Sequence, residues 1–207
     1  MKAPKQKEAV TGARQRIIDA ALTLFTRHGY AAVKTRDIAS EAGINLALLN
    51  YYFGGKEKLF EIVMLENLGR FFKGVSLIVN DESTTFYRKI ELLVDFYITR
   101  LTDNPDLPLF VLTQAKNNPK RLPPQVQHIG TSLFLKQYRD EVKAGRLIKM
   151  NEGHLMLNLL GLSIFPFSAR SMAKKIRNIS DEEFIDLMKE RRKLIPQWMK
   201  AMLQLKK

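Results

Sequence analysis

The sequence contains no cysteine among its 207 residues. Disulfide bonds, thiolate catalysis and cysteine-ligated zinc are therefore excluded, and a protein of the reducing cytoplasm is expected. The sequence also lacks the run of about 20 apolar residues that a membrane-spanning helix needs. Its longest apolar segment, about 155–167, is shorter and contains Asn158 and Pro166. The basic start, Met1 to Lys5, leads into polar residues, so we expect neither a secretory signal nor a membrane span.

Acidic residues are too few to balance the basic ones. The 21 Asp and Glu residues face 34 Lys and Arg residues, which leaves a formal net charge of +13. This excess favours a polyanionic partner, but it does not distinguish nucleic acid from an anionic membrane surface. With 45% hydrophobic and 27% charged residues, the composition is typical of a folded globular protein with one large domain or two smaller ones.

Signatures of catalysis are also missing. His28, His128 and His154 are scattered, and we find no HExxH pattern, nucleophile elbow, Gly-rich phosphate loop or catalytic carboxylate pair. We therefore expect no enzymatic activity, metal or cofactor. An enzyme acting on a small molecule and a basic membrane-surface protein are kept as alternative classes, the latter because residues 189–193 are rich in Lys and Arg.

The hydrophobic periodicity is helical throughout, and no hairpin signal joins two β-branched runs, which predicts an all-α protein of about nine helices. Three short helices come first: one ends at Gly29, one runs from an N-cap at Thr35 to Ala42, and one spans Leu46 to Tyr52. The later predicted helices cover about 56–79, 86–101, a segment that restarts at Asn104-Pro105 with Asn as cap, 125–144, 152–175 with a kink at Pro166, and 181–205 behind the capping box Ser180-Asp181-Glu182-Glu183.

The second and third short helices, separated by Gly43-Ile44-Asn45, have the layout of a helix-turn-helix. Many further spacings agree over residues 12–60: Arg16-Ile17-Ile18-Asp19-Ala20-Ala21-Leu22-Thr23-Leu24-Phe25, Gly29-Tyr30, Thr35, Ile38-Ala39, Ala42-Gly43-Ile44, Tyr51-Tyr52-Phe53, Lys56-Glu57 and Leu59. This combination resembles the N-terminal domain of the TetR/AcrR family of transcriptional regulators. The sequence departs from the family pattern at Asn50, Tyr52 and Gly55, where the family frequently has Tyr, His and Ser or Asn.

The resemblance implies an all-α homodimer with a DNA-binding domain at 12–72 and a ligand-binding and dimerisation domain at 73–207. It implies a repressor that binds double-stranded DNA at a near-palindromic operator and is released by a small-molecule effector. A ligand-independent regulator and an activator are the alternatives within the family.

The DNA-reading face follows from the third helix, where Leu49 and Phe53 are expected to pack inward with Ile38 and Ile44. Asn pairs well with adenine and Leu or Ala with thymine methyl groups, so we predict an A·T-containing half-site. Thr35, Tyr52 and Lys56 are expected to bind phosphates, whereas Leu46 and Leu48 have a second interpretation as core residues. The predicted DNA-binding residues are Thr35, Arg36, Asn45, Leu46, Ala47, Leu48, Asn50, Tyr51, Tyr52 and Lys56. A basic N-terminal arm, either on the DNA or solvated, comprises Lys2, Lys5, Lys7, Arg14 and Arg16.

The second domain is expected to supply a largely apolar pocket and a dimer contact. The pocket candidates are aromatic: Phe96, Tyr97, Phe110, Phe134, Tyr138, Phe165 and Phe167. The dimer candidates lie on the last two long predicted helices: Leu155, Leu159, Leu162, Phe184, Leu187, Met188, Ile195 and Trp198. Both sets have intramolecular packing as the alternative. His128, His154 and Arg170 are candidates for orienting a polar ligand group, or else surface residues.

Overall fold

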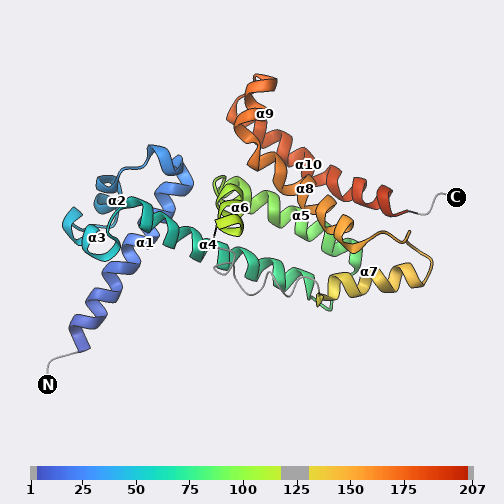
Figure 1. Ribbon diagram of the computed structural model, residues 1–207, viewed down its shortest axis with the longest axis horizontal. Helices are drawn as coiled ribbons and strands as arrows, with labels where there is room; N and C mark the ends of the chain where they lie inside the picture. The colour runs from blue at the N-terminus through green and yellow to red at the C-terminus, as the bar shows by residue number, and fades with distance from the viewer. Residues whose placement is uncertain (1–3, 118–130, 205–207) are drawn as a thin grey trace. The chain divides into compact units, whose positions relative to one another are not determined.

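The computed structural model describes residues 4–117 and 131–204, and of residues 4–11 and 114 the backbone alone. These ranges contain ten α-helices and no strand, which confirms the all-α prediction (Figure 1). The chain forms two compact units, one up to Gly69 and one from Arg70 onward. The boundary falls within a long helix, α4.

The first unit contains α1 (Pro4–Ala32), α2 (Thr35–Glu41), α3 (Leu46–Phe53) and the first part of α4 (Lys56–Val79). Helix α1 is interrupted at Gly29, whose φ of 74° and ψ of 162° are not helical. A positive φ is readily adopted by glycine, which explains why the regular part of α1 ends where the sequence predicts.

The turn between α2 and α3 is a Schellman motif. Gly43 takes a φ of 64°, its N–H donates to the Ser40 carbonyl at 3.1 Å, and the N–H of Ile44 donates to the Ala39 carbonyl at 3.0 Å. These two bonds satisfy carbonyls that the end of α2 would otherwise leave open. The glycine in the predicted turn is therefore a requirement of the backbone geometry.

The start of α2 differs from the prediction. Thr35 is the first helical residue and not the N-cap, which is Lys34 with an extended backbone. The carboxylate of Asp37 accepts the Lys34 N–H at 2.9 Å, so an acidic residue in the first turn holds the cap position. Threonine is a common N-cap residue, which is why the sequence favours Thr35 at that position. The hydrogen bond from the Lys34 N–H to Asp37 uses only the backbone of residue 34, so a lysine can occupy the cap position.

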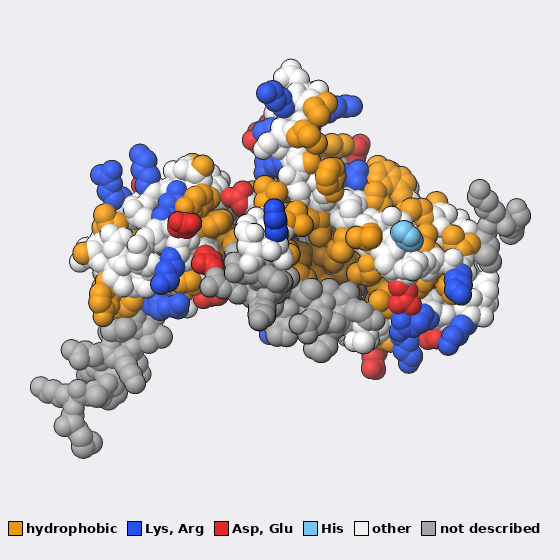
Figure 2. Space-filling model, in the orientation of Figure 1, with side chains coloured by type: hydrophobic (Ala, Val, Ile, Leu, Met, Phe, Trp, Pro, Cys, Tyr) orange, Lys and Arg blue, Asp and Glu red, His pale blue; other side chains and the backbone are white. Residues whose placement is uncertain are grey.

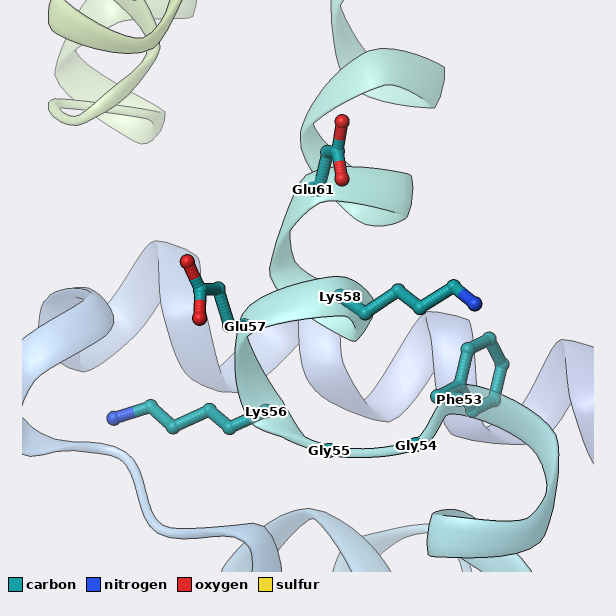
Figure 3. A pocket seen from close by; sticks show the side chains of 7 residues that line it. All are labelled: Phe53, Gly54, Gly55, Lys56, Glu57, Lys58 and Glu61. Carbon is teal, nitrogen blue, oxygen red and sulfur yellow. The ribbon is translucent and has the colours of Figure 1, made fainter.

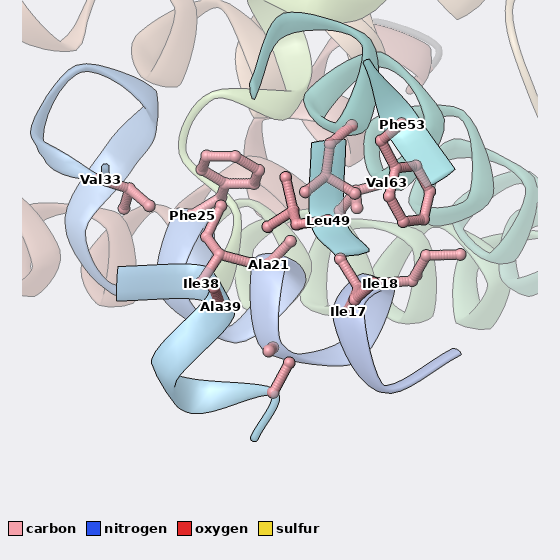
Figure 4. Packing of buried hydrophobic residues seen from close by; sticks show 13 residues of the cluster. Ile17, Ile18, Ala21, Phe25, Val33, Ile38, Ala39, Leu49, Phe53 and Val63 are labelled. Carbon is pink, nitrogen blue, oxygen red and sulfur yellow. The ribbon is translucent and has the colours of Figure 1, made fainter. Parts of the chain in front are cut away.

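A single apolar cluster joins the helices of the first unit (Figure 4). Residues from all four helices contribute, and the short helices are held by this shared packing because helices of seven or eight residues are unstable alone. The buried residues of the cluster include Ile17, Ile18, Ala21, Phe25, Ile38, Leu49, Phe53, Leu59 and Val63.

The second unit contains the rest of α4 and α5 (Phe86–Asp103), α6 (Leu107–Asn117), α7 (Leu133–Lys143), α8 (Glu152–Ser168), α9 (Arg170–Arg177) and α10 (Asp181–Leu203). Helices α8 and α10 both pack on α5 and on each other. The predicted capping box of α10 is confirmed: Ser180 Oγ accepts the Glu183 N–H at 3.1 Å, and the Glu183 carboxylate accepts the Ser180 N–H at 2.7 Å.

A buried lysine organises the turn between α4 and α5. Lys89 is fully buried, and its ammonium donates to the carbonyl oxygens of Asp81 and Thr84 and, at 2.9 Å, to the Thr84 hydroxyl. Burial lowers the pKa of Lys89, and the nearby Asp81 carboxylate opposes that change. Gln137 of α7 donates to the same Thr84 carbonyl at 2.8 Å, so three helices meet at this linker.

Helix α6 begins later than the sequence predicts. Asn104 ends α5 as its C-cap, and α6 begins at Leu107, so the predicted restart at Asn104-Pro105 is wrong. The N–H of Asn104 donates to the Arg100 carbonyl at 3.0 Å, so Asn104 belongs to the last turn of α5. In the described residues α7 begins at Leu133, and the earlier part of the helix predicted over 125–144 lies outside them.

The long helix predicted over 152–175 is two helices, which raises the count from nine to ten in the described ranges. Helices α8 and α9 meet at Ala169 with a bend of 70°. Pro166 lacks the N–H that would bind the Leu162 carbonyl four residues earlier, and Arg191 of α10 donates to that carbonyl at 2.8 Å instead. The sequence predicts a kink at Pro166. The hydrogen bond from α10 stabilises the backbone there, because it binds the carbonyl that the proline cannot.

Across residues 4–117 and 131–204, a membrane crossing is not supported by the length and apolar character of any single helix. The bent pair of α8 and α9 meets these two criteria when its helices are counted together.

Candidate nucleic-acid interface

Helix α3 presents two different faces. Leu49 and Phe53 are buried in the cluster of the first unit, as predicted, and Figure 4 shows both side chains among those of α1 and α4. Ala47, Asn50 and Tyr51 are exposed on the opposite side, and Tyr51 keeps 81% of its surface accessible. The apolar residues at 49 and 53 therefore fix the helix and leave a face with a methyl group, an amide and a phenol accessible to a partner.

Leu46, Leu48 and Tyr52 lie between these two faces, and all three are half-buried. Neither leucine is part of the buried core, and neither is fully accessible, so each retains a side available for contact. The Tyr52 ring packs against the cluster and lies edge-on to the Tyr51 ring, with 5.4 Å between centroids. Tyr52 is thereby positioned by packing, with a preset direction for its hydroxyl.

Asn45 and the residues at the start of α2 also border α3. The Asn45 side-chain oxygen accepts the Leu48 N–H at 2.8 Å and caps α3. This role is not among the predicted ones, although an Asn just before an apolar helical run is a known start signal. Arg36 is exposed and Thr35 half-buried at the first turn of α2.

The turn from α3 into α4 requires its two glycines. Gly54 and Gly55 have φ values of 70° and 146°, and nothing lies within 4 Å of a Cβ added at either position. Backbone conformation alone therefore accounts for the pair. The turn borders a shallow hollow that is also lined by Phe53, Lys56, Glu57, Lys58 and Glu61, and Lys56 and Lys58 extend from it in opposite directions (Figure 3).

Lys56 is half-buried, and its ammonium lies 4.2 Å from the centroid of the Tyr30 ring. This first-turn position, close to the positive end of the helix dipole of α4, suits an anion. Glu57 and Glu61 line the same hollow, so it is not uniformly cationic.

Two arginines of α1 support the helix-turn-helix. Arg16 donates from Nε to the Ala42 carbonyl at 3.4 Å, and the Arg14 guanidinium lies 5.5 Å from the Phe53 ring centroid. Both are predicted as part of a basic arm that is either on the DNA or solvated, and both have contacts within the unit. Lys2 and the side chains of Lys5 and Lys7 lie outside the described residues.

The predicted pocket residues fall into separate groups in the second unit. Tyr97 is buried and stacks on Phe71 at 5.7 Å, with Phe96 beside them, and burial raises the pKa of Tyr97. A second group forms around Phe86, which stacks on Phe134 at 5.0 Å and lies 5.7 Å from the Tyr138 ring.

The remaining pocket candidates differ in exposure. Phe167 is buried against Phe184, Phe110 is half-buried, and Phe165 is 63% exposed. The pocket stays a prediction. His154 is exposed, Arg170 is paired with Asp181, and His128 lies outside the described residues.

The predicted dimer residues are mostly core residues of the second unit. Leu162 is half-buried, Leu187 and Trp198 are exposed, and the other five are buried: Leu155, Leu159, Phe184, Met188 and Ile195. Exposed apolar residues outside the predicted set occupy the neighbouring helix positions: Leu157 on α8, and Met172 and Ile176 on α9.

The fold and the exposed α3 define a helix-turn-helix protein with a second, all-helical unit. Residues 17–63 match the family model described as bacterial regulatory proteins, tetR family. Over these residues the first unit is similar to the TetR family of regulatory proteins.

Curated relatives match about half of the chain or less. The HTH-type transcriptional regulator BetI of Brucella abortus is 30% identical over 113 residues, which cover 53% of this chain and 57% of BetI. The dual regulator CecR of Shigella flexneri is 48% identical over 48 residues, or 23% and 21% of the two chains. This chain therefore spans little more than half the length of the BetI relative that it matches.

Solved structures share the fold over nearly the whole chain. A TetR transcription regulator from Haloarcula marismortui has a TM-score of 0.66 at 20% identity, covering 94% of this chain and all of that one. A regulator from Saccharomonospora viridis in complex with choline has a TM-score of 0.62 at 20% identity, with 95% and 100% coverage.

Proposed function

We propose that the protein is a homodimeric, sequence-specific DNA-binding transcriptional regulator, a repressor that a small molecule releases from a near-palindromic operator. The observation that carries the proposal is the two-sided α3. Its inner residues are fixed in the core, whereas Ala47, Asn50 and Tyr51 are accessible on a helix whose diameter fits the major groove. The net charge of +13 supports a polyanionic partner.

The residues divide into those that read bases and those that bind phosphate. Asn50 has an exposed amide that matches the N6 and N7 edge of adenine, and Ala47 has a methyl group suited to thymine. Lys56, at the first turn of α4, contributes a cation that is indifferent to sequence. An A·T-containing half-site follows from this assignment.

Footprinting on the DNA upstream of the protein's own gene tests the proposal and supplies the operator. We expect Asn50→Ala to lose discrimination at one base position, at a cost of about 1–3 kcal/mol against the preferred base. Lys56→Ala is expected to weaken binding to every duplex. The slope of log affinity against log salt concentration is expected to fall by the contribution of about one phosphate contact per subunit. Lys175→Ala on α9 removes an exposed charge in the second unit and serves as the control.

Equal losses for Asn50→Ala and Lys56→Ala on all sequences would contradict the division of roles. A wild-type protein that binds no duplex even at low salt would contradict DNA binding itself.

Self-association is supported by exposed apolar side chains on α8 and α10. Leu157 and Phe165 are 67% and 63% exposed on one side of α8, and Leu187 and Trp198 are exposed on one side of α10. In Figure 2, hydrophobic side chains also gather along α9 and the adjoining part of this unit. If this surface is buried against a second copy of the chain, the DNA-binding units of both copies can contact one operator.

Sedimentation equilibrium tests the dimer. We expect Phe165→Glu to shift the protein toward monomer by at least tenfold in dissociation constant, since a charge would be buried in an apolar contact. Leu112→Glu, on the exposed side of α6, introduces the same charge and is the matched control. Dimers of unchanged stability in Phe165→Glu would exclude this face.

The effector is proposed to be a small molecule bound in the second unit. The choline complex of the Saccharomonospora viridis regulator supports ligand binding by this fold, and the aromatic content of the unit suits a largely apolar ligand. A compound collection that includes choline is to be tested for raising the melting temperature and releasing footprinted DNA. A compound that stabilises the protein without altering DNA affinity would not be the effector, because release requires different affinities for the two states.

A further inference from the structure

We propose that Tyr30 is a positioning residue for DNA binding, which holds the Lys56 ammonium in place for a phosphate group. The proposal rests on the proposed function, because it assumes that Lys56 contacts the DNA backbone. It adds a residue that lies outside the helix-turn-helix and touches no base. The observation behind it is the ammonium of Lys56 over the face of the Tyr30 ring, 4.2 Å from its centroid.

The break in α1 delivers Tyr30 to this position. Gly29 leaves the helical conformation with a φ of 74°, and Tyr30 follows it directly. The Tyr30 ring then packs 4.6 Å from Phe60 and 6.0 Å from Phe25, while Phe25 and Phe60 lie edge to face at 5.0 Å. The buried Phe25 ring and the half-buried Phe60 ring therefore hold the Tyr30 ring against which the ammonium lies.

Lys56 reaches the ring because of helical spacing. Lys56 and Phe60 are four residues apart on α4 and lie on the same side of it, so the lysine side chain follows the face that packs on Tyr30. Lys58 extends in the opposite direction from the same turn (Figure 3) and is exposed. This neighbouring lysine provides an internal comparison on the same helix turn.

A cation over an aromatic face is electrostatically attracted to it and keeps its other N–H bonds for acceptors. An unrestrained lysine loses much of its rotamer freedom when it binds a phosphate, whereas Lys56 has lost part of that freedom already. The Tyr30 ring therefore lowers the cost of the phosphate contact and adds nothing to sequence discrimination.

The size of the effect follows from the strength of such contacts at partly exposed sites. We expect Tyr30→Leu to weaken DNA binding about 2- to 5-fold for each DNA-binding unit, hence about 4- to 25-fold for a dimer with two. Tyr30→Phe keeps the ring and is expected to bind like the wild type. The preference among operator sequences is expected to be unchanged in both variants.

A double-mutant cycle separates positioning from a general structural role. Full-length wild type, Tyr30→Leu, Lys56→Met and the double variant are titrated by fluorescence anisotropy against a labelled duplex of mixed sequence, about 30 base pairs long, at low salt. If Tyr30 acts through Lys56, Tyr30→Leu has no further effect in the Lys56→Met protein. In a Lys58→Met protein, the loss caused by Tyr30→Leu is expected to persist in full.

Equal losses with and without Lys56 would overturn the inference, as would wild-type affinity in Tyr30→Leu. A wild type that binds no duplex would instead overturn the proposed function. NMR of the wild type gives a second measurement that does not depend on a variant folding. Ring currents of Tyr30 are expected to shift the Lys56 Cε protons upfield of those of Lys58, and equal shifts would also overturn the inference.

Discussion

The hydrogen bond from Arg191 to the Leu162 carbonyl gives a quantitative test of the second unit. Pro166 lacks the N–H that would normally bind this carbonyl, and Arg191 Nη2 donates to it at 2.8 Å. Arg191→Met retains much of the apolar stem but removes the donor. Loss of a charge-assisted hydrogen bond costs about 1–3 kcal/mol, and the partial burial of this bond places the expected value in the lower half of that range.

The assay is urea unfolding followed by tryptophan fluorescence, because the chain has one tryptophan, Trp198, and it lies on α10 in the second unit. The Arg191 guanidinium sits 5.2 Å from the Trp198 ring centroid, so the variant changes the amplitude of the signal as well as the midpoint. The free energy is therefore taken from the midpoint and slope of each curve.

Pro166→Ala supplies the decisive background, since alanine restores the missing N–H to the Leu162 carbonyl. We expect Arg191→Met to cost about 1 kcal/mol less in that background than in the wild type. Arg192→Met is the control, because Arg192 binds Asp95 and Thr99 on α5 and should cost the same in both backgrounds. An undiminished cost of Arg191→Met in the Pro166→Ala protein would refute the role of Arg191 as the substitute donor for the Leu162 carbonyl.

Two further predictions concern packing and pH. A Cβ at position 74 would lie 2.4 Å from the Phe96 ring, so Gly74→Ala is expected to cost about 1–3 kcal/mol in urea unfolding, whereas Gly161→Ala, with nothing within 4 Å, should not destabilise the unit by overpacking. The hydrogen bond from Lys174 lowers the pKa of Asp181, so its stabilisation is present above the ordinary Asp pKa of about 3.9 and is lost as the pH falls through the lowered value. Asp181→Asn is therefore expected to flatten the decline of stability below about pH 4, and parallel acid limbs for variant and wild type would contradict this.

Helix boundaries were predictable where the signal was local. The bounds of α4, the break at Gly29 and the capping box of α10 each depend on residues within a few positions of one another. The full separation of α8 from α9 was not predictable in this way. The carbonyl that Pro166 leaves open within α8 is bound by Arg191, which lies 25 positions beyond Pro166 in the chain.

The same distinction applies to the candidate sites. The buried face of α3 could be predicted from the four-residue spacing of Leu49 and Phe53, because this short helix packs a single apolar face against a single core. For α8 and α10, periodicity identified apolar residues but not their partners, and Leu155 and Ile195 are buried within their own unit. The contact between Tyr30 and Lys56 also escaped prediction, since it depends on the direction in which Gly29 turns the chain.

The ammonium of Lys89 has a mechanical consequence for the second unit. Its bonds to Asp81 and Thr84 clamp the linker that joins α4 to α5, and separation of the two helix ends would leave a buried cation without its oxygen ligands. The linker between α4 and α5 therefore has little conformational freedom. A displacement of α5 is therefore expected to move the last turn of α4 with it, because the residues between the two helices are held too tightly to absorb the movement.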